Sequence, residues 1–344
     1  MKISVPDNVH NLPLILEPDP KLESTDLRAW CAGHTELMDE LLLNHGAILF
    51  RGFGIRTAES FEQLVRGLSD DLCDYVDGNS PRSRIGSNVY TSTEYPPEYF
   101  ISLHNELSYA GRWPERLYFC CITAAEQGGG TALADCRRIL RDLPPSIVAE
   151  FKEKQIRYLR YLHGGTGFGR SWQETFETAD QKIVDDYLTQ SGTTREWKAD
   201  GALRLSCTRP ATAYHPQTGK EIWFNQADQF HPSTHPTEIY EMMMFLYQND
   251  VERLPQHVTF GDGSPIPEAT LNQIRATVAR HTTDCQWQAG DFLIVDNMLV
   301  CHGRMPFTGK RQVLVAMSGC VTWPEVTTPQ KLVSEPRHWA TLTR

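Results

Sequence analysis

The residues best suited to chemistry in this sequence are two histidines and one glutamate. His104 and Glu106 lie two positions apart at the end of an expected strand. Much later in the chain, a strand and a tight turn are followed by an expected short strand, which places His302 on an inward face with Val300. Because alternate strand residues point to one face, the first pair would present an imidazole and a carboxylate side by side. Two imidazoles and one carboxylate are the donor set of a ferrous site with three open positions. The alternative is that these are core histidines with ordinary hydrogen-bond partners.

An arginine and a glycine-rich turn could add an anion site. Arg311 opens an apolar strand, and an arginine directed inward there requires an anionic partner, since an unpaired buried charge is costly. A guanidinium holds a carboxylate through two parallel hydrogen bonds. Three consecutive glycines end at the hydroxyl donor Thr131. The alternatives are a surface salt bridge for Arg311 and a plain hairpin turn for the glycines.

The elements that must position these side chains form two β-rich stretches separated by a helical one. Expected strands cover residues 47–50, 99–104, 115–123, 130–135, 214–224, 258–260, 291–295 and 311–321. Expected helices cover a segment from Thr25 or Asp26 to about 43, then 57–68, 140–200, 236–250 and 266–280, while 1–22 form an extended arm and 70–97 a loop. This pattern favours an α+β fold with a β-sandwich or jelly-roll core and flanking helices.

No repeat or long linker divides the chain. We therefore expect one domain over 1–344, with a β-core at about 85–140 and 205–322 and a helical insert or lid at about 141–200. The run Gly165-Thr166-Gly167-Phe168-Gly169 is not a dinucleotide-binding fingerprint, because Arg170 occupies the position of its last glycine.

Composition excludes several classes of protein. The chain has 33 basic and 43 acidic residues, a formal charge of −10, so a nucleic-acid partner is not expected. No apolar run is long enough to cross a membrane, and the first twenty residues show no secretory signal. The nine cysteines form no C-x-x-C pair, which is typical of reduced thiols in a cytoplasmic protein. The oligomeric state cannot be read from the sequence.

The order of these motifs resembles the taurine/chlorophenoxyacetate dioxygenase family over about residues 45–320. The order consists of His-x-Glu at 104–106, Gly-Gly-Gly-Thr at 128–131, Gly-Asp-Phe-Leu-Ile-Val-Asp-Asn at 290–297, His302 and Arg311. Residues 46–53 resemble that family's first strand. Residues 90–96, 103–109 and 222–226 resemble the branch associated with amino-acid hydroxylation in peptide natural-product pathways, of which the syringomycin-pathway aspartyl hydroxylase is typical.

The resemblance implies a double-stranded β-helix (jelly-roll, cupin-like) fold and an Fe(II)- and 2-oxoglutarate-dependent oxygenase. It implies that His104, Glu106 and His302 bind iron and that Arg311, helped by Thr131, holds the distal carboxylate of 2-oxoglutarate, with O2 as the other co-substrate. Relatives that halogenate replace the carboxylate ligand by a small residue. Glu106 therefore argues against halogenation.

The resemblance also implies a substrate class. We expect hydroxylation of an unactivated C–H bond in an amino acid or an aminoacyl or peptide-derived substrate, free or tethered to a carrier protein, in natural-product (antibiotic) biosynthesis. Four polar residues near the edges of the β-core could bind its headgroup: Asn225, Arg82, Thr91 and Arg209. For each of them, ordinary turn hydrogen bonding is the alternative. The other functions left open are desaturation or cyclisation at the same iron site, and a non-catalytic jelly-roll binding protein.

Overall fold

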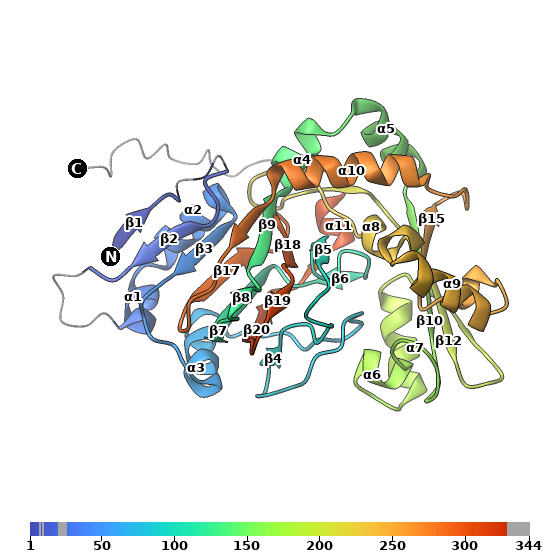
Figure 1. Ribbon diagram of the computed structural model, residues 1–344, viewed down its shortest axis with the longest axis horizontal. Coiled ribbons are helices and arrows are strands. Elements are labelled where there is room, and N and C mark those ends of the chain that lie inside the picture. The colour runs from blue at the N-terminus through green and yellow to red at the C-terminus, as the bar shows by residue number, and fades with distance from the viewer. Residues whose placement is uncertain (7, 9, 20–25, 329–344) are drawn as a thin grey trace.

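Two β-sheets form the centre of the molecule (Figure 1). The computed structural model describes residues 1–6, 8, 10–19 and 26–328. The larger sheet has the order β1 (Lys2–Ser4), β2 (Leu14–Glu17), β3 (Ala47–Phe50), β17 (Phe292–Asp296), β7 (Arg116–Thr123), β20 (Gln312–Ser318) and β4 (Tyr90–Thr91). The smaller sheet has the order β16 (Thr283–Cys285), β9 (Thr131–Asp135), β18 (Val300–Arg304) and β5 (Ile101–His104).

The two sheets face each other across an apolar layer. The ring of Phe119 on β7 lies 5.4 Å from the imidazole of His302 on β18. Alternate residues of β20, Val313, Val315 and Met317, are buried in the same cluster, as the sequence predicts for the strand that follows Arg311. The histidines of interest therefore point into the space between the sheets.

The other face of the larger sheet is covered by three helices, α1 (Leu27–Gly33), α2 (Thr35–His45) and α3 (Ala58–Leu68). The expected helix from residue 26 to 43 is wrong in one respect, since it is interrupted at His34. The caps are confirmed: Asp26 and Thr57 accept hydrogen bonds from the first turns of α1 and α3, and Gly46 ends α2 at φ 77°. Thr25, the other candidate cap, lies outside the described residues.

Two segments differ from the expected pattern. The N-terminal arm contributes β1 and β2 to the larger sheet, so it is not merely extended chain. The stretch 141–200 is not wholly helical, because it contains β10 (Ile156–Leu162) and β11 (Thr194–Trp197) among α5 (Pro145–Lys154), α6 (Trp172–Phe176) and α7 (Gln181–Gln190). These strands join β12 (Leu203–Arg209) and β15 (Gln256–Phe260) in a second four-stranded sheet, whose pairing is set by partners outside the stretch.

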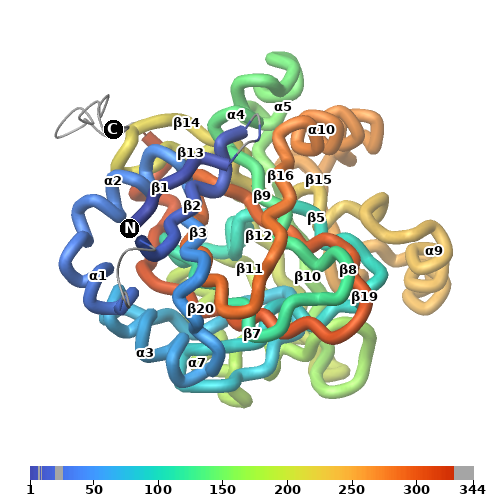
Figure 2. The backbone as a smooth tube through the Cα atoms, turned by 60° about the vertical axis from the view of Figure 1, so that its left-hand side comes forward, coloured from blue at the N-terminus to red at the C-terminus, as the bar shows by residue number. Residues whose placement is uncertain are grey.

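The remaining elements connect and cover the sheets. Short strand pairs are β13 (Thr212–Tyr214) with β14 (Glu221–Trp223), β6 (Arg112–Trp113) with β21 (Val321–Thr322), and β8 (Gln127–Gly128) with β19 (Phe307–Thr308). The other helices are α4 (Cys136–Asp142), α8 (Ala227–Phe230), η1 (Pro232–Thr234), α9 (Thr237–Leu246), η2 (Val251–Arg253), α10 (Glu268–His281) and α11 (Trp323–Val326). Figure 2 shows α9 on the side of the molecule opposite α1.

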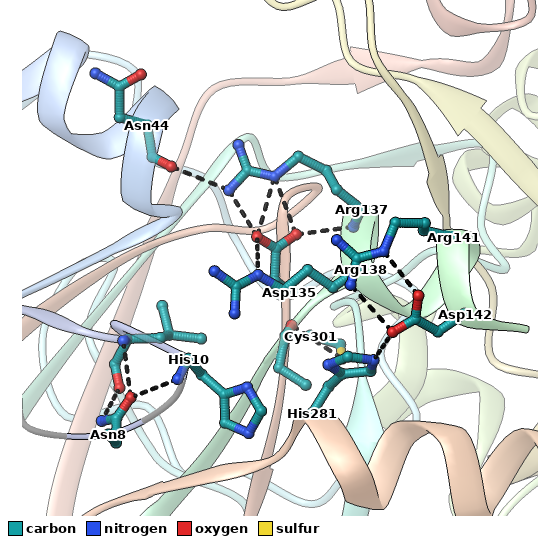
Figure 3. A network of polar contacts seen from close by, with 12 residues as sticks. Asn8, His10, Asn44, Asp135, Arg137, Arg138, Arg141, Asp142, His281 and Cys301 are labelled. Carbon is teal, nitrogen blue, oxygen red and sulfur yellow. Dashed lines mark hydrogen bonds and ion pairs between the residues drawn. The ribbon is translucent and has the colours of Figure 1, made fainter.

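A polar network ties α4, which directly follows β9, to its neighbours (Figure 3). Arg137 pairs with Asp135 at 2.8 Å and donates to the carbonyl oxygens of Leu43 and Asn44 at the end of α2. At the other end of α4, His281 of α10 lies 2.9 Å from the carboxylate of Asp142. These contacts hold α4 between α2 and α10, and so fix the end of β9 beside β18.

The cysteines and the lengths of the apolar helices bear on the class of the protein. All nine cysteines are free thiols. Within the described part of the chain, no helix combines the length and the apolar character that crossing a bilayer requires.

We predict that Gly303→Ala separates β5 from β18. A Cβ at Gly303 would lie 2.3 Å from the carbonyl oxygen of Ile101, a backbone atom that cannot move without shifting β5. We expect a loss of about 1–3 kcal/mol in the free energy of unfolding, measured by chemical denaturation. Gly33→Ala is the matched control, because a Cβ there meets no atom within 4 Å. Equal stability of the two variants would contradict this view of the β5–β18 contact.

Candidate metal centre and active site

Three buried side chains meet between the two sheets. One ligand atom from each of His104, Glu106 and His302 lies within 4.8 Å of the others. The two imidazole rings are 4.4 Å apart between centroids, and Nε2 of His302 is 4.0 Å from Oε2 of Glu106. All three residues are buried. Residues from two distant parts of the sequence therefore form one compact set of nitrogen and oxygen donors.

The strand register brings the two histidines together. β18 pairs antiparallel with β5, and His302 lies directly opposite His104. Nδ1 of His104 lies 2.9 Å from the carbonyl oxygen of Ser102, to which a protonated Nδ1 can donate. In that tautomer Nε2 of His104 keeps its lone pair for a metal. A hydrogen bond of this kind sets both the tautomer and the orientation of a metal-binding imidazole.

Glu106 reaches the site from a turn and not, as we expected, from the strand face. β5 ends at His104, and the next residues turn sharply, with Leu107 at φ 59°. Asn297 holds this turn: its Oδ1 accepts from the Glu106 backbone N–H at 2.7 Å, and its Nδ2 donates to the carbonyl oxygens of Glu106 and Pro114. Alternation along a strand accounts for the spacing of His104 and Glu106, and it gives no signal of this role of Asn297, which the sequence reasoning missed.

A second carboxylate, that of Asp296, stabilises the turn that precedes the strand of His302. Asp296 ends β17, and its Oδ1 accepts from the backbone N–H groups of Met298 and Leu299. Its Oδ2 lies 3.0 Å from Nε2 of the buried His215. The Asp-Asn pair at 296–297 therefore builds the turn that starts β18 and, through Asn297, also holds the turn of Glu106.

The electrostatics favour metal binding by neutral imidazoles. Burial lowers the pKa of His104, and the nearby Glu106 opposes part of this effect. Burial, together with His104 and Arg82, holds the pKa of His302 well below its ordinary value. Both rings are therefore uncharged near neutral pH, with lone pairs available. Nδ1 of His302 is buried without a hydrogen-bond partner among the described residues, and the donor set fits a ferrous ion.

Arg311 and Thr131 line the same small cavity as His104 and His302. Arg311 donates through Nε to the carbonyl oxygen of Gly129 at 2.8 Å and through Nη1 to Oγ of Ser92 at 3.2 Å. Burial, with Arg304 nearby, lowers the pKa of Arg311 to about 10. Neither contact supplies a negative charge. The guanidinium is therefore suited to bind an anion that enters the cavity.

The glycine run is a turn that receives Arg311. Gly129 has φ 71°, and a Cβ there would lie 3.0 Å from Cδ of Arg311. Thr131 follows at the start of β9, where its Oγ1 accepts from the indole N–H of Trp287 at 3.0 Å. This leaves the hydroxyl proton of Thr131 free to be donated into the cavity. Among the described residues Arg311 forms no ion pair, so the structure offers no support for the alternative of a surface salt bridge.

Arg304 is a residue that the sequence reasoning missed. It lies two positions after His302 on β18, lines the same cavity, and donates to the carbonyl oxygens of Tyr95, Pro96 and Tyr99. Its position two residues from His302 was the signal that could have identified it. Arg304 therefore ties the loop 82–98 to the strand that carries His302.

This loop lines the cavity. Ser92 and Thr93 of the loop are part of the lining of this partly open cavity, which has a volume of about 30 Å³. The loop's role as a lid stays a prediction. The other expected lid, residues 141–200, lines neither this cavity nor the larger one described next. Its role as a lid is therefore not supported.

A larger cavity of about 420 Å³ lies among β5, β18, α8 and α10. It is lined by Ser102, Leu103 and Cys301, the strand neighbours of His104 and His302, and by Gln229. Asn225 also lines it, but its side-chain amide donates to Ala211 O and accepts from Ala227 N–H. The amide of Asn225 is therefore largely occupied by the turn that it belongs to.

The other three candidate substrate residues lie in different surroundings. Arg82 lines the small cavity and contacts Glu106. Thr91 lines neither cavity. Its Oγ1 accepts from the backbone N–H of Ser83 and donates to the carboxylate of Glu94 within its own loop. Arg209 also lines neither, and its guanidinium donates to the carbonyl oxygens of Tyr109 and Ser191. For Thr91 and Arg209 the structure supports ordinary structural bonding.

Comparisons with known proteins show which family the chain resembles. The model of the "Taurine catabolism dioxygenase TauD, TfdA family" matches residues 11–317. The dapdiamide synthesis protein DdaC of Enterobacter agglomerans is 40% identical over 280 residues, which are 81% of this chain and 84% of that protein.

Two solved structures share the fold at low sequence identity. PvcB, an Fe, alpha-ketoglutarate-dependent oxygenase from an isonitrile synthetic pathway, has a TM-score of 0.53 at 16% identity, covering 91% of this chain and 89% of that one. An asparagine oxygenase in complex with Fe(II), 3-hydroxyasparagine and succinate has a TM-score of 0.51 at 14% identity, covering 85% and 78%.

We predict that Asn297→Ala loosens the metal centre without touching a ligand. It removes three buried hydrogen bonds around Glu106, so we expect a loss of about 2–5 kcal/mol in the free energy of unfolding. Ferrous iron should bind about 10- to 100-fold more weakly. Chemical denaturation and iron titration measure the two effects. Asn272→Ala, at an exposed position on α10, is the control. If both variants match the wild type, Asn297 does not position Glu106.

Proposed function

Since the chain belongs to the taurine catabolism dioxygenase TauD, TfdA family, and is thus a non-haem iron oxygenase that depends on 2-oxoglutarate, we propose that it hydroxylates a C–H bond of an amino acid or amino-acid-derived substrate. The observation that carries the proposal is the meeting of His104, Glu106 and His302 in the cavity that Arg311 lines. This arrangement supports a ferrous site with a co-substrate anchor beside it.

Each side chain has a role that its surroundings support. The neutral imidazoles of His104 and His302 and the carboxylate of Glu106 would hold the iron. Arg311 would hold the distal carboxylate of 2-oxoglutarate, and Thr131 would donate a hydrogen bond to it. If the loop 82–98 closes over bound ligands, it would keep bulk water away from the reacting atoms. When bound, iron and 2-oxoglutarate supply the oxidising chemistry, which consumes O2 and yields succinate and carbon dioxide.

The proposal extends to the fold and its boundaries. We infer that the two facing sheets form a double-stranded β-helix, because strands distant in sequence alternate within each sheet and the site lies between the sheets. A single oxygenase domain is part of the same proposal, since the main apolar cluster joins both central sheets to β10, β15, α8 and α10. The cytoplasmic location stays a prediction.

The substrate class rests on the relative DdaC, whose name refers to dapdiamide synthesis. A natural-product pathway and an amino-acid-type substrate are proposed on that basis. Attachment of the substrate to a carrier protein stays a prediction. Glu106 supplies a carboxylate in the proposed ligand set, so we propose oxygen transfer and not halogenation.

We predict that Arg311→Ala mainly raises the requirement for 2-oxoglutarate. Loss of a charge-assisted bidentate contact corresponds to about 2–4 kcal/mol, which is about 30- to 1000-fold in the Kd of 2-oxoglutarate. Anaerobic titration of the ferrous protein, read from the visible band of the iron–2-oxoglutarate chelate, measures this Kd. Arg141→Ala, an exposed arginine on α4, should bind like the wild type. An unchanged Kd in Arg311→Ala would remove Arg311 as the anchor.

We predict that His104→Ala and His302→Ala abolish both iron binding and succinate formation, since each removes one of the three donors. A screen of amino acids, free and thioester-tethered, tests turnover by succinate release and by product mass. Hydroxylation adds one oxygen atom to the substrate, and desaturation removes two hydrogen atoms. Succinate with a hydroxylated product is expected. No succinate with any substrate would instead favour a non-catalytic binding protein.

A further inference from the structure

Arg82 is held beside the proposed iron site with hydrogen-bond donors to spare. Its guanidinium pairs with the carboxylate of Glu106, and both side chains are buried, with exposed fractions of 3% and 5%. The guanidinium also lies over the ring of Tyr75, 4.1 Å from its centroid. The ion pair and the ring fix the plane and the direction of the guanidinium.

The ion pair leaves much of the guanidinium unused. An arginine has five N–H donors, and only Nη2 of Arg82 is bonded to Glu106. Nε and Nη1 are buried and have no hydrogen-bond partner among the described residues. Arg82 lines the cavity that contains His104 and His302. Buried donors without acceptors are costly, so these N–H groups call for an acceptor that arrives with a ligand.

The positive charges around the cavity exceed the negative ones, which favours the binding of a second anion. Three guanidinium groups line it, those of Arg82, Arg304 and Arg311. Glu106 is the one carboxylate that forms an ion pair with any of them in the described ranges. In the proposed function, Glu106 is committed to a divalent cation and the distal carboxylate of 2-oxoglutarate to Arg311. The free donors of Arg82 then still lack a negative partner.

We propose that Arg82 binds a carboxylate of the substrate, so that the substrate is an amino-acid-type acid with at least one free carboxylate close to the carbon that is oxidised. This inference rests on the proposed function. It does not require that the carboxylate be the α-carboxylate. A side-chain carboxylate has the same chemistry, and it is the one still free when the α-carboxyl group is tied up in a thioester.

The test uses the full chain with Fe(II) and 2-oxoglutarate under anaerobic conditions, where the chelate band reports binding without turnover. The probes are the twenty L-amino acids, their α-carboxamides, and the pairs aspartate with asparagine and glutamate with glutamine. At least one carboxylate probe should perturb the band. Its counterpart with that carboxylate amidated should bind about 30-fold or more weakly. The α-amides and the side-chain pairs distinguish the two sources of the carboxylate.

Variants assign the effect to Arg82. Arg82→Met should weaken the active probe by the same factor while the Kd of 2-oxoglutarate stays close to that of the wild type. Because Arg82→Met leaves Glu106 without its partner, Arg82→Lys is the second variant: it keeps the charge but loses the fork of donors, so the probe should again bind more weakly. Arg84→Met is the control, since Arg84 lies in the same loop but is 43% exposed and pairs with Asp74 and Glu177.

Several results would overturn the proposal. These are equal binding of the acid and its amide, unchanged affinity in Arg82→Lys, or a chelate band that no carboxylate probe perturbs. Failure of the proposed function looks different, because the wild type would then form no chelate band before any probe is added.

Discussion

The pairing of β5 with β18 is the interaction on which the rest of the site depends. It places His104 opposite His302, and no local spacing could do so, because the two strands are far apart in the chain. Gly303 permits the close approach, since any side chain there would meet the backbone of Ile101. Asn297 then adds Glu106 to the pair by bonding both backbone groups of that residue. One strand register and one asparagine thus assemble the three proposed ligands.

The excess of positive charge around the cavity favours the binding of anions. The cavity between the sheets is rich in guanidinium groups and poor in carboxylates, which is unfavourable in a buried space unless anions enter. Arg311 and Arg82 both line this cavity, but their hydrogen-bond partners differ. Arg311 donates to a carbonyl oxygen and to a hydroxyl oxygen, whereas Arg82 donates to the carboxylate of Glu106. Arg304 instead donates to carbonyl oxygens of the loop 82–98, which lines the cavity. Arginines on one cavity can therefore either keep spare donors or hold a loop, depending on their acceptors.

The sequence was sufficient where local rules decide the structure. The helix from Ala58 to Leu68 has its Thr57 cap, and the strand that ends at His104 lies close to its expected bounds. It was insufficient where distant contacts decide. Strand β10 lies within a stretch that resembles a helical insert because its partners, β12 and β15, come later in the chain.

The same division holds within the site. The order of the motifs was sufficient to propose roles for the three iron ligands and for Arg311. The turn that delivers Glu106 and the structural use of Arg209 could not, because both depend on backbone carbonyl and N–H groups that any residue type supplies.

The central claim is that His104, Glu106 and His302 share one iron ion. The most direct measurement is anomalous diffraction at the iron edge from crystals of the protein loaded anaerobically with Fe(II). The account predicts one strong peak between the two sheets, within coordination distance of both imidazoles and of the Glu106 carboxylate. A peak elsewhere in the molecule, or one that either histidine does not reach, would contradict it.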